Sequence, residues 1–150
     1  MPKFKYSKFT ANKFGQVKQE WFLASSSEKD PDYYGIAHYR TEGPAVIDFD
    51  GTQIYYLNGS IGRLEGPAVI HPNGVLEYWN NGKISRKDGA AILYPDGGTD
   101  WMLNGLYHRT DGPAREMADG RKEYFYKGKM IEASTDKEFI KKIKFINLMF

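Results

Sequence analysis

The sequence of 150 residues contains no cysteine. Disulfide bonds, thiolate zinc or iron–sulfur sites and a cysteine nucleophile are therefore excluded, and packing must stabilise the fold. The sequence also lacks any run of about 18 apolar residues, the length that a transmembrane helix needs. Residues 1–14 interleave lysines with single aromatic residues instead of forming an apolar secretion signal. We therefore expect a soluble, cytoplasmic protein without a signal peptide.

The motifs that mark common catalytic sites are also missing: a Gly-x-Ser-x-Gly elbow, a phosphate-binding loop and a dinucleotide fingerprint. The three histidines occupy different positions of the repeat described below, so no metal-ligand spacing connects them. Asp48 and Asp50 begin like a calcium loop, but Thr52 stands at the next ligand position and the closing glutamate is absent. We predict no catalytic residue, no metal and no cofactor. A hydrolase that gathers such aspartates in space is the third-ranked alternative.

Glycine and aromatic residues are abundant, and the glycines reveal a strict repeat of 23 residues. The chain has 16 glycines, 15% aromatic and 41% hydrophobic residues, which is typical of an all-β globular protein. A fixed period of this length indicates a repeat architecture, and four repeats fill residues 37–128. The glycines in register are Gly43, Gly66, Gly89 and Gly112; Gly51, Gly74, Gly97 and Gly120; and Gly59, Gly82, Gly105 and Gly128.

Each repeat contains a strong signal for a β-hairpin, an Asp-Gly or Asn-Gly pair between apolar stretches. Asp50-Gly51 is the first such pair. We expect type I′ turns there, because both central residues of that turn need positive φ, and strands of about six residues. A second Asn-Gly, first seen at Asn58, is expected to end the second strand, with residues 58–67 forming one wide reversal. The predicted fold is a repeat β-meander of about eight strands in a single twisted antiparallel sheet.

The repeat resembles the MORN repeat, and more closely its variants with His-Arg-x-Asp-Gly-Pro-Ala. That motif is complete at His108-Arg109-Thr110-Asp111-Gly112-Pro113-Ala114, and shorter forms begin at the preceding arginines. The resemblance implies a hairpin array that serves as a scaffold for protein or lipid contacts. The variants are similar to those of uncharacterised bacterial and bacteriophage proteins, which implies a small phage protein in the host cytoplasm. Aromatic pairs replace the Tyr-x-Gly strand of the standard unit, so a membrane partner is not expected.

The segments outside the repeats are expected to cap the array. Residues 1–36 carry no repeat; residues 3–6 and 20–23 predict one or two strands, and residues 25–32 predict a loop. Residues 129–150 predict a helix from about residue 136 to 148, because Thr135 and Glu138 fit a capping box before apolar residues at helical spacing. Four lysines make this helix basic, so it either only closes the sheet or also meets an acidic partner or a membrane surface. We expect one structural domain overall.

An aromatic pair recurs in the second strand of three repeats, and the remaining repeat has Trp101-Met102 at these positions. Because adjacent residues of a strand point to opposite faces, the pairs predict two aromatic ladders. Such a ladder either packs a thin sheet across its strands or offers a surface for bases or a protein. The candidate binding residues are Tyr55, Tyr78, Trp101 and Tyr124 on one face, and Tyr56, Trp79 and Phe125 on the other.

One arginine recurs at the same position of every repeat. A row of guanidinium groups can bind phosphates or an acidic protein. The same 23-residue spacing of arginines results when each arginine has a structural role and bonds backbone carbonyls of the segment that leads into the next hairpin, which we call the link. Each repeat also has an acidic residue near its arginine. Both interpretations stay open for Arg40, Arg63, Arg86 and Arg109.

From these features we predict a non-catalytic interaction protein with a protein partner, and in concrete form a phage accessory protein that binds and blocks a host protein. The main alternative is a protein that sequesters a nucleotide or nucleic acid with its arginine row and aromatic residues. The net charge of +2 is small for a duplex-binding protein, although both ends of the chain are basic. A homo-oligomer would also cover one aromatic face.

Overall fold

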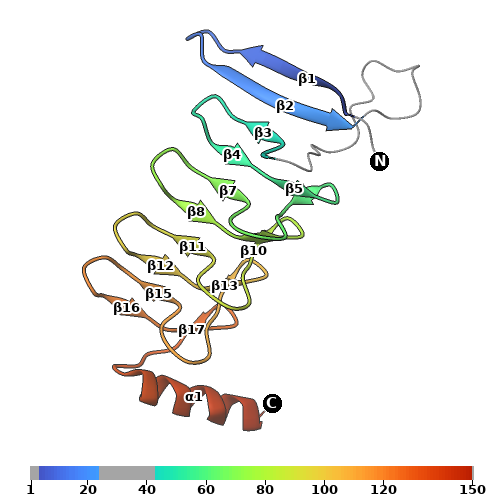
Figure 1. The fold of residues 1–150 in the computed structure, drawn as a ribbon. Helices are drawn as coiled ribbons and strands as arrows, with labels where there is room; N and C mark the ends of the chain where they lie inside the picture. Colours follow the sequence, from blue (N-terminus) through green and yellow to red (C-terminus); the bar gives the residue numbers. More distant parts are fainter. Residues whose placement is uncertain (1–3, 24–42, 150) are drawn as a thin grey trace. The chain divides into compact units, whose positions relative to one another are not determined.

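In the computed structural model of this protein, residues 4–23 and 43–149 are described, so Arg40 and the predicted loop at 25–32 lie outside them. Within the described residues the chain forms eighteen β-strands and one C-terminal helix (Figure 1). The predicted all-β class with a capping helix is confirmed. The chain divides into two compact units, Met1–Gly82 and Lys83–Phe150, which we call the N-terminal and the C-terminal unit.

The main sheet of the N-terminal unit has the strand order β1-β2-β3-β4-β7-β8. Strands β1 (Phe4–Ala11) and β2 (Val17–Leu23) form an antiparallel hairpin before the repeats, where one or two strands were predicted at residues 3–6 and 20–23. Strand β2 pairs antiparallel with β3, so this hairpin covers the first repeat strand as a cap. The repeat strands of this sheet are β3 (Val46–Ile47), β4 (Gln53–Ile54), β7 (Val69–Ile70) and β8 (Leu76–Glu77).

The main sheet of the C-terminal unit has the strand order β11-β12-β15-β16, again antiparallel. Its strands are β11 (Ile92–Leu93), β12 (Thr99–Asp100), β15 (Arg115–Glu116) and β16 (Lys122–Glu123). Helix α1 (Asp136–Met149) follows the last repeat.

A second series of short strands flanks the Asn-Gly pairs, and this series differs from the prediction. In the N-terminal unit these strands are β5 (Tyr56–Leu57), β6 (Ser60–Ile61) and β9 (Trp79–Asn80). In the C-terminal unit they are β10 (Lys83–Ile84), β13 (Met102–Leu103), β14 (Leu106–Tyr107), β17 (Phe125–Tyr126) and β18 (Lys129–Met130). The predicted wide reversal is therefore a second hairpin, as in the antiparallel pair β5–β6.

The predicted six-residue strands are interrupted at one aromatic residue per repeat, namely Tyr55, Tyr78, Trp101 and Tyr124. Tyr55 illustrates the reason: its backbone N donates to Ala68 O (2.7 Å) in the main sheet, whereas its carbonyl accepts from Gly62 N (3.1 Å) in the second hairpin. Trp101 makes the equivalent bonds with Ala114 and His108. The chain thus passes from one hairpin to the next at a single aromatic residue.

The type I′ turn does not occur at the Asp-Gly pairs for which it was predicted. The type I′ geometry occurs at the second pair, where Asn58, Asn81, Asn104 and Lys127 have φ between 49° and 53° and precede a glycine of positive φ. At Asp50-Gly51, by contrast, the glycine alone has positive φ (88°). Asp48 N donates to Thr52 O (2.8 Å), and Gly51 N donates to Asp48 O (2.9 Å), which makes a three-residue loop with a glycine bulge. Asp50 Oδ1 accepts from Thr52 N at 2.8 Å, so an Asx-type bond selects this loop.

A fully buried alanine recurs where each main-sheet hairpin begins. Ala45, Ala68, Ala91 and Ala114 are at most 1% exposed. Their backbone N atoms donate across the hairpin, as Ala114 does to Glu123 O at 2.9 Å. A larger side chain would have to displace neighbours on all sides, so alanine at this position is a packing requirement.

Helix α1 begins as its capping box predicts. Thr135 Oγ1 accepts from Glu138 N (3.2 Å), and Glu138 Oε2 accepts from Ser134 N (2.9 Å). Phe139 and Ile143 of the helix are buried against Tyr124 and Tyr126. The apolar stripe of the helix therefore covers the last aromatic residues of the array, which is the capping role expected of it.

Candidate functional site

The three described arginines of the row are each bonded to the backbone of the segment that follows them. The Nη1 atom donates to the carbonyl four residues later in all three described arginines: Arg63 to Pro67 (3.3 Å), Arg86 to Ala90 (3.1 Å) and Arg109 to Pro113 (3.2 Å). The guanidinium of Arg63 also stacks on the Tyr55 ring at 3.9 Å, and that of Arg109 stacks on Trp101 at 4.0 Å. These contacts match the structural interpretation of the arginine row.

The glycine three residues after Arg86 and the one three residues after Arg109 make room for the guanidinium. A Cβ at Gly89 would lie 2.9 Å from Cζ of Arg86, and a Cβ at Gly112 would lie 3.1 Å from Cζ of Arg109. Arginine, glycine and the bonded carbonyl thus form one structural motif. The Arg-x-x-Gly pattern therefore has a steric cause at these two arginines, whereas Gly66 after Arg63 is required by its positive φ of 87°.

Arg109 carries two further bonds that neutralise its charge. Its Nε donates to Asp111 Oδ1 at 2.7 Å, and its Nη1 donates to Glu116 Oε1 at 3.1 Å. Its side chain is only 19% exposed. A ligand phosphate would have to compete with these carboxylates for the guanidinium.

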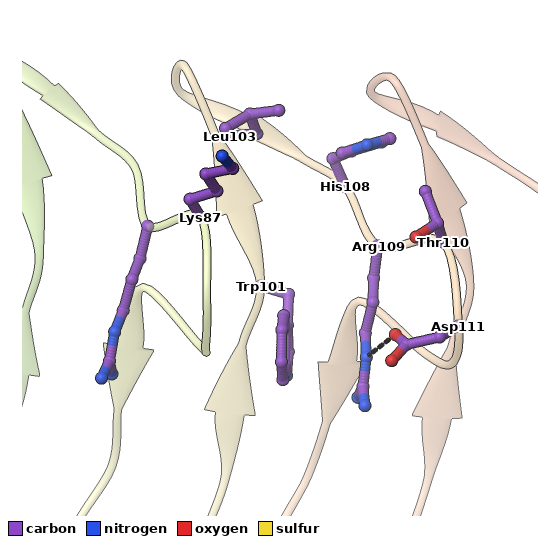
Figure 2. A pocket seen from close by; sticks show the side chains of 8 residues that line it. Lys87, Trp101, Leu103, His108, Arg109, Thr110 and Asp111 are labelled. Atoms are coloured by element: carbon purple, nitrogen blue, oxygen red, sulfur yellow. Dashed lines mark hydrogen bonds and ion pairs between the residues drawn. The ribbon is translucent and has the colours of Figure 1, made fainter.

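A groove of about 320 Å³ opens beside Arg109 in the C-terminal unit (Figure 2). It brings together three residues predicted as binding candidates: Arg86, Trp101 and Arg109. The other lining residues are Lys87, Leu103, His108, Thr110 and Asp111. Figure 2 shows the Trp101 ring and the Arg109 side chain side by side, with the Asp111 carboxylate bonded to Arg109. Within the groove, Lys87 is exposed and Leu103 is 37% exposed, so both are accessible to a partner.

His108 is a lining residue that the sequence interpretation set aside. Its Nδ1 accepts from Lys127 N at 3.1 Å, which requires that nitrogen to be unprotonated. Burial lowers the pKa of His108, and the nearby Lys127 charge lowers it further. Ser85, at the same position of the preceding repeat, accepts the equivalent bond from Asn104 N at 3.1 Å. This shared register was the signal that could have identified His108.

A buried acid, Asp100, anchors a polar network that sequence reasoning also missed. Asp100 is 3% exposed and accepts from the hydroxyls of Tyr94 (3.1 Å) and Tyr107 (3.2 Å) and from Nε of Arg115 (3.1 Å). Burial and the neighbouring Asp100 raise the pKa of Tyr94 to about 12. Arg115 also donates from Nη1 to Glu123 Oε2 at 3.1 Å, which extends the network. Because both carboxylate oxygens of Asp100 accept protein donors, the network stabilises the hairpins.

The remaining aromatic candidates are partly or wholly covered. Tyr55, Tyr56, Tyr78 and Trp79 are half-buried in the N-terminal unit, and Trp79 Nε1 donates to Glu77 Oε2 at 2.7 Å. Phe125 lies 5.0 Å from the ring of Tyr107. Tyr124 is 5% exposed and donates its hydroxyl to Asp136 Oδ1 at 2.7 Å. The structure therefore places Tyr124 in the interface with α1.

The aspartates considered for acid–base chemistry serve the first loop. Asp48 Oδ1 accepts from Phe49 N at 2.8 Å, and the bond from Thr52 N lowers the pKa of Asp50. Across the described part of the chain, no group of three or more His, Asp or Glu side chains is placed to hold a metal ion. Among residues 4–23 and 43–149, no helix has the length and apolar character needed to cross a membrane.

Comparison of the chain with protein-family models, with curated proteins and with solved structures finds no match. The resemblance of the repeats to MORN-like units therefore stays a prediction.

Proposed function

We propose that this protein is a non-catalytic binding module for a protein partner, and that the groove beside Arg109 is part of its contact surface. The proposal rests on a contrast among the residues of this groove: two side chains are held in place by contacts within the fold, and two others are exposed to a partner. Arg109 and Trp101 are stacked and bonded within the fold. Lys87 and Leu103 remain accessible above them. A rigid floor with an accessible cation and an accessible apolar side chain suits protein recognition.

The hairpin next to the groove adds apolar surface to it. Leu103 and Leu106 flank the Asn104-Gly105 turn, and Leu106 is 52% exposed. Met130, in the last hairpin of the same unit, is 59% exposed. The exposed leucines at this turn give a partner apolar surface to cover, and methionine is enriched in interfaces.

A nucleotide ligand is the second candidate, and the groove favours it less. Trp101 and the cations of the groove offer stacking and charge, which is the feature that supports it. However, Arg109 is already bonded to two carboxylates, and the Asp111 side chain is 71% exposed. This carboxylate would repel a phosphate at the rim.

The proposal is tested by capture of the partner from a host extract with the double variant Lys87→Glu/Leu103→Ser. The matched control is Lys83→Glu/Leu64→Ser, which makes the same exchanges at exposed positions outside the groove. The proposal predicts that a specific protein is captured by the unmodified chain and by the control, and lost by the groove variant. Equal capture by all three proteins would contradict it. The prediction from phage-carried arrays, that the partner is a host protein whose activity is blocked, is tested by assaying the captured protein with and without this chain.

A further inference from the structure

Helix α1 has an outer face that takes no part in capping the array. Its inner face is closed by Phe139 (0% exposed) and Ile143 (4%), and Tyr126 donates its hydroxyl to Asn147 Oδ1 at 2.7 Å. On the other side, Phe145 is 63% exposed and Leu148 is 86% exposed. These large apolar side chains face solvent and do not contribute to the contact by which the helix caps the sheet.

The apolar residues of the outer face are interleaved with lysines. Phe145, Leu148 and Met149 are spaced by three and four residues, so they share one face. Lys141 lies one turn before Phe145, and Lys144 lies one turn before Leu148. The outer face is therefore a mixed strip of apolar and cationic side chains.

The acids of the helix are already engaged, so the strip has no internal counter-charge. Asp136 accepts from the Tyr124 hydroxyl, and Glu138 pairs with Lys142 at 2.7 Å. In residues 4–23 and 43–149, Lys141 and Lys144 form no ion pair. A partner that covers Phe145 and Leu148 must bring its own carboxylates to meet these lysines.

This charge pattern discriminates among possible occupants. A second copy of α1 would oppose lysine with lysine, which disfavours self-association through this face. A membrane-surface helix buries a continuous apolar face, but the continuous apolar face of α1 is already buried against Tyr124 and Tyr126. The strip instead complements a helix or strand that alternates acidic and apolar side chains.

We propose that the outer face of α1 is a docking surface for an acidic amphipathic segment of a partner protein. Apolar side chains of that segment cover Phe145 and Leu148, and its carboxylates pair with Lys141 and Lys144. The inference rests on the proposed function in assigning a protein as the partner, but it uses a surface separate from the groove.

The test measures binding of a labelled helical peptide by fluorescence anisotropy. The peptide carries leucines at positions i, i+3 and i+4 with glutamates between them, and its counterpart has lysine at every glutamate. The protein variants are Phe145→Ser/Leu148→Ser and Lys141→Glu/Lys144→Glu. The matched control is Lys13→Glu/Phe14→Ser, because Lys13 lies over the Phe14 ring at 5.0 Å and Phe14 is 76% exposed. All these side chains are exposed, so the variants keep the fold, and thermal unfolding verifies it.

The acidic peptide is expected to bind at least about tenfold more tightly than its basic counterpart at low salt, and both helix variants are expected to lose that binding. The control variant and Lys87→Glu/Leu103→Ser are expected to retain it. Retention by the groove variant separates this inference from the proposed groove, since failure at the groove would leave peptide binding intact. Absence of peptide binding, equal binding of the basic peptide, or tighter binding of the same face to phosphatidylglycerol vesicles would each overturn the inference.

Discussion

The ring of Phe139 lies 5.1 Å from the ring of Tyr124, at an interplanar angle of 36°. Trp101, one repeat earlier, is covered instead by the guanidinium of Arg109, eight residues further along the chain. Eight residues beyond Tyr124 stands Glu132, which cannot stack in that way. Phe139 of helix α1 packs on Tyr124 in place of an arginine. A ring–ring contact therefore ends a series of arginine–aromatic contacts.

Phe139→Ala should therefore unfold the end of the array. Phe139 is fully buried, and removing a buried phenyl ring costs about 3–5 kcal/mol of stability. Phe145→Ala, on the exposed face of the same helix, should change stability by less than about 0.5 kcal/mol. Urea unfolding monitored by circular dichroism measures both. Equal losses in the two variants would contradict the capping contact.

Gly112→Ala and Gly89→Ala should each destabilise the protein by about 1–3 kcal/mol, because the new methyl group meets the arginine guanidinium. Gly62→Ala is the matched control: its Cβ would meet ordinary contacts, the nearest at 3.5 Å from Trp79 O. Thermal unfolding gives the comparison, and tryptophan fluorescence reports whether Arg109 leaves Trp101. If all three variants lose the same stability, the link between glycine and arginine is wrong.

Lys127→Asn should stabilise the protein by about 0.5–1 kcal/mol, because lysine tolerates the left-handed region poorly and asparagine tolerates it well. The reciprocal exchange Asn104→Lys, at the equivalent turn of the preceding repeat, should have the opposite sign. Denaturant unfolding of both variants checks the pair. A gain in stability from Asn104→Lys would show that the turn conformation does not control these positions.

Stability should fall as the pH drops through about 6.5, the ordinary pKa of histidine. The pKa of His108 is lowered in the folded protein, so the unfolded chain binds more protons in this window and is favoured by acid. Protonation also removes the acceptor for Lys127 N. His108→Ser keeps an acceptor like that of Ser85 but does not titrate, so its melting temperature should depend less on pH between 7.5 and 5. Equal pH dependence in the two proteins would exclude His108 as the cause.

The repeat, its hairpins and the C-terminal helix could be predicted because each rests on local signals. Thr135 and Glu138 mark the helix start whatever lies around them, and the spacing of Gly-Pro-Ala links fixes the repeat. The strand break at Tyr55 could not be predicted, because an apolar run looks the same whether it stays in one sheet or crosses between two hairpins. The type I′ turn was predicted at the wrong pair because Asn-Gly and Asp-Gly have similar propensities, and the side-chain bond of Asp50 to Thr52 N selects a different loop at Asp50-Gly51.

The candidate site was predictable only in part. Arg86, Trp101 and Arg109 were singled out by periodicity, and the fold gathers them at one groove. Lys87 and His108 differ in residue type from their counterparts in the other repeats, so a comparison of residue types concealed them, although His108 shares the register and bond of Ser85. The Asp100–Arg115 pair joins residues fifteen positions apart at 3.1 Å, and only the strand register that places Asp100 opposite Arg115 reveals it.

The described arginines of the row belong to the fold, and we propose that the accessible groove residues bind a protein. Native mass spectrometry of the chain purified from its own host tests this proposal most directly, with Lys87→Glu/Leu103→Ser measured alongside. We expect a polypeptide to co-purify with the unmodified chain and to be absent from the variant. A nucleotide-sized adduct that is released on denaturation, with no polypeptide bound, would contradict it.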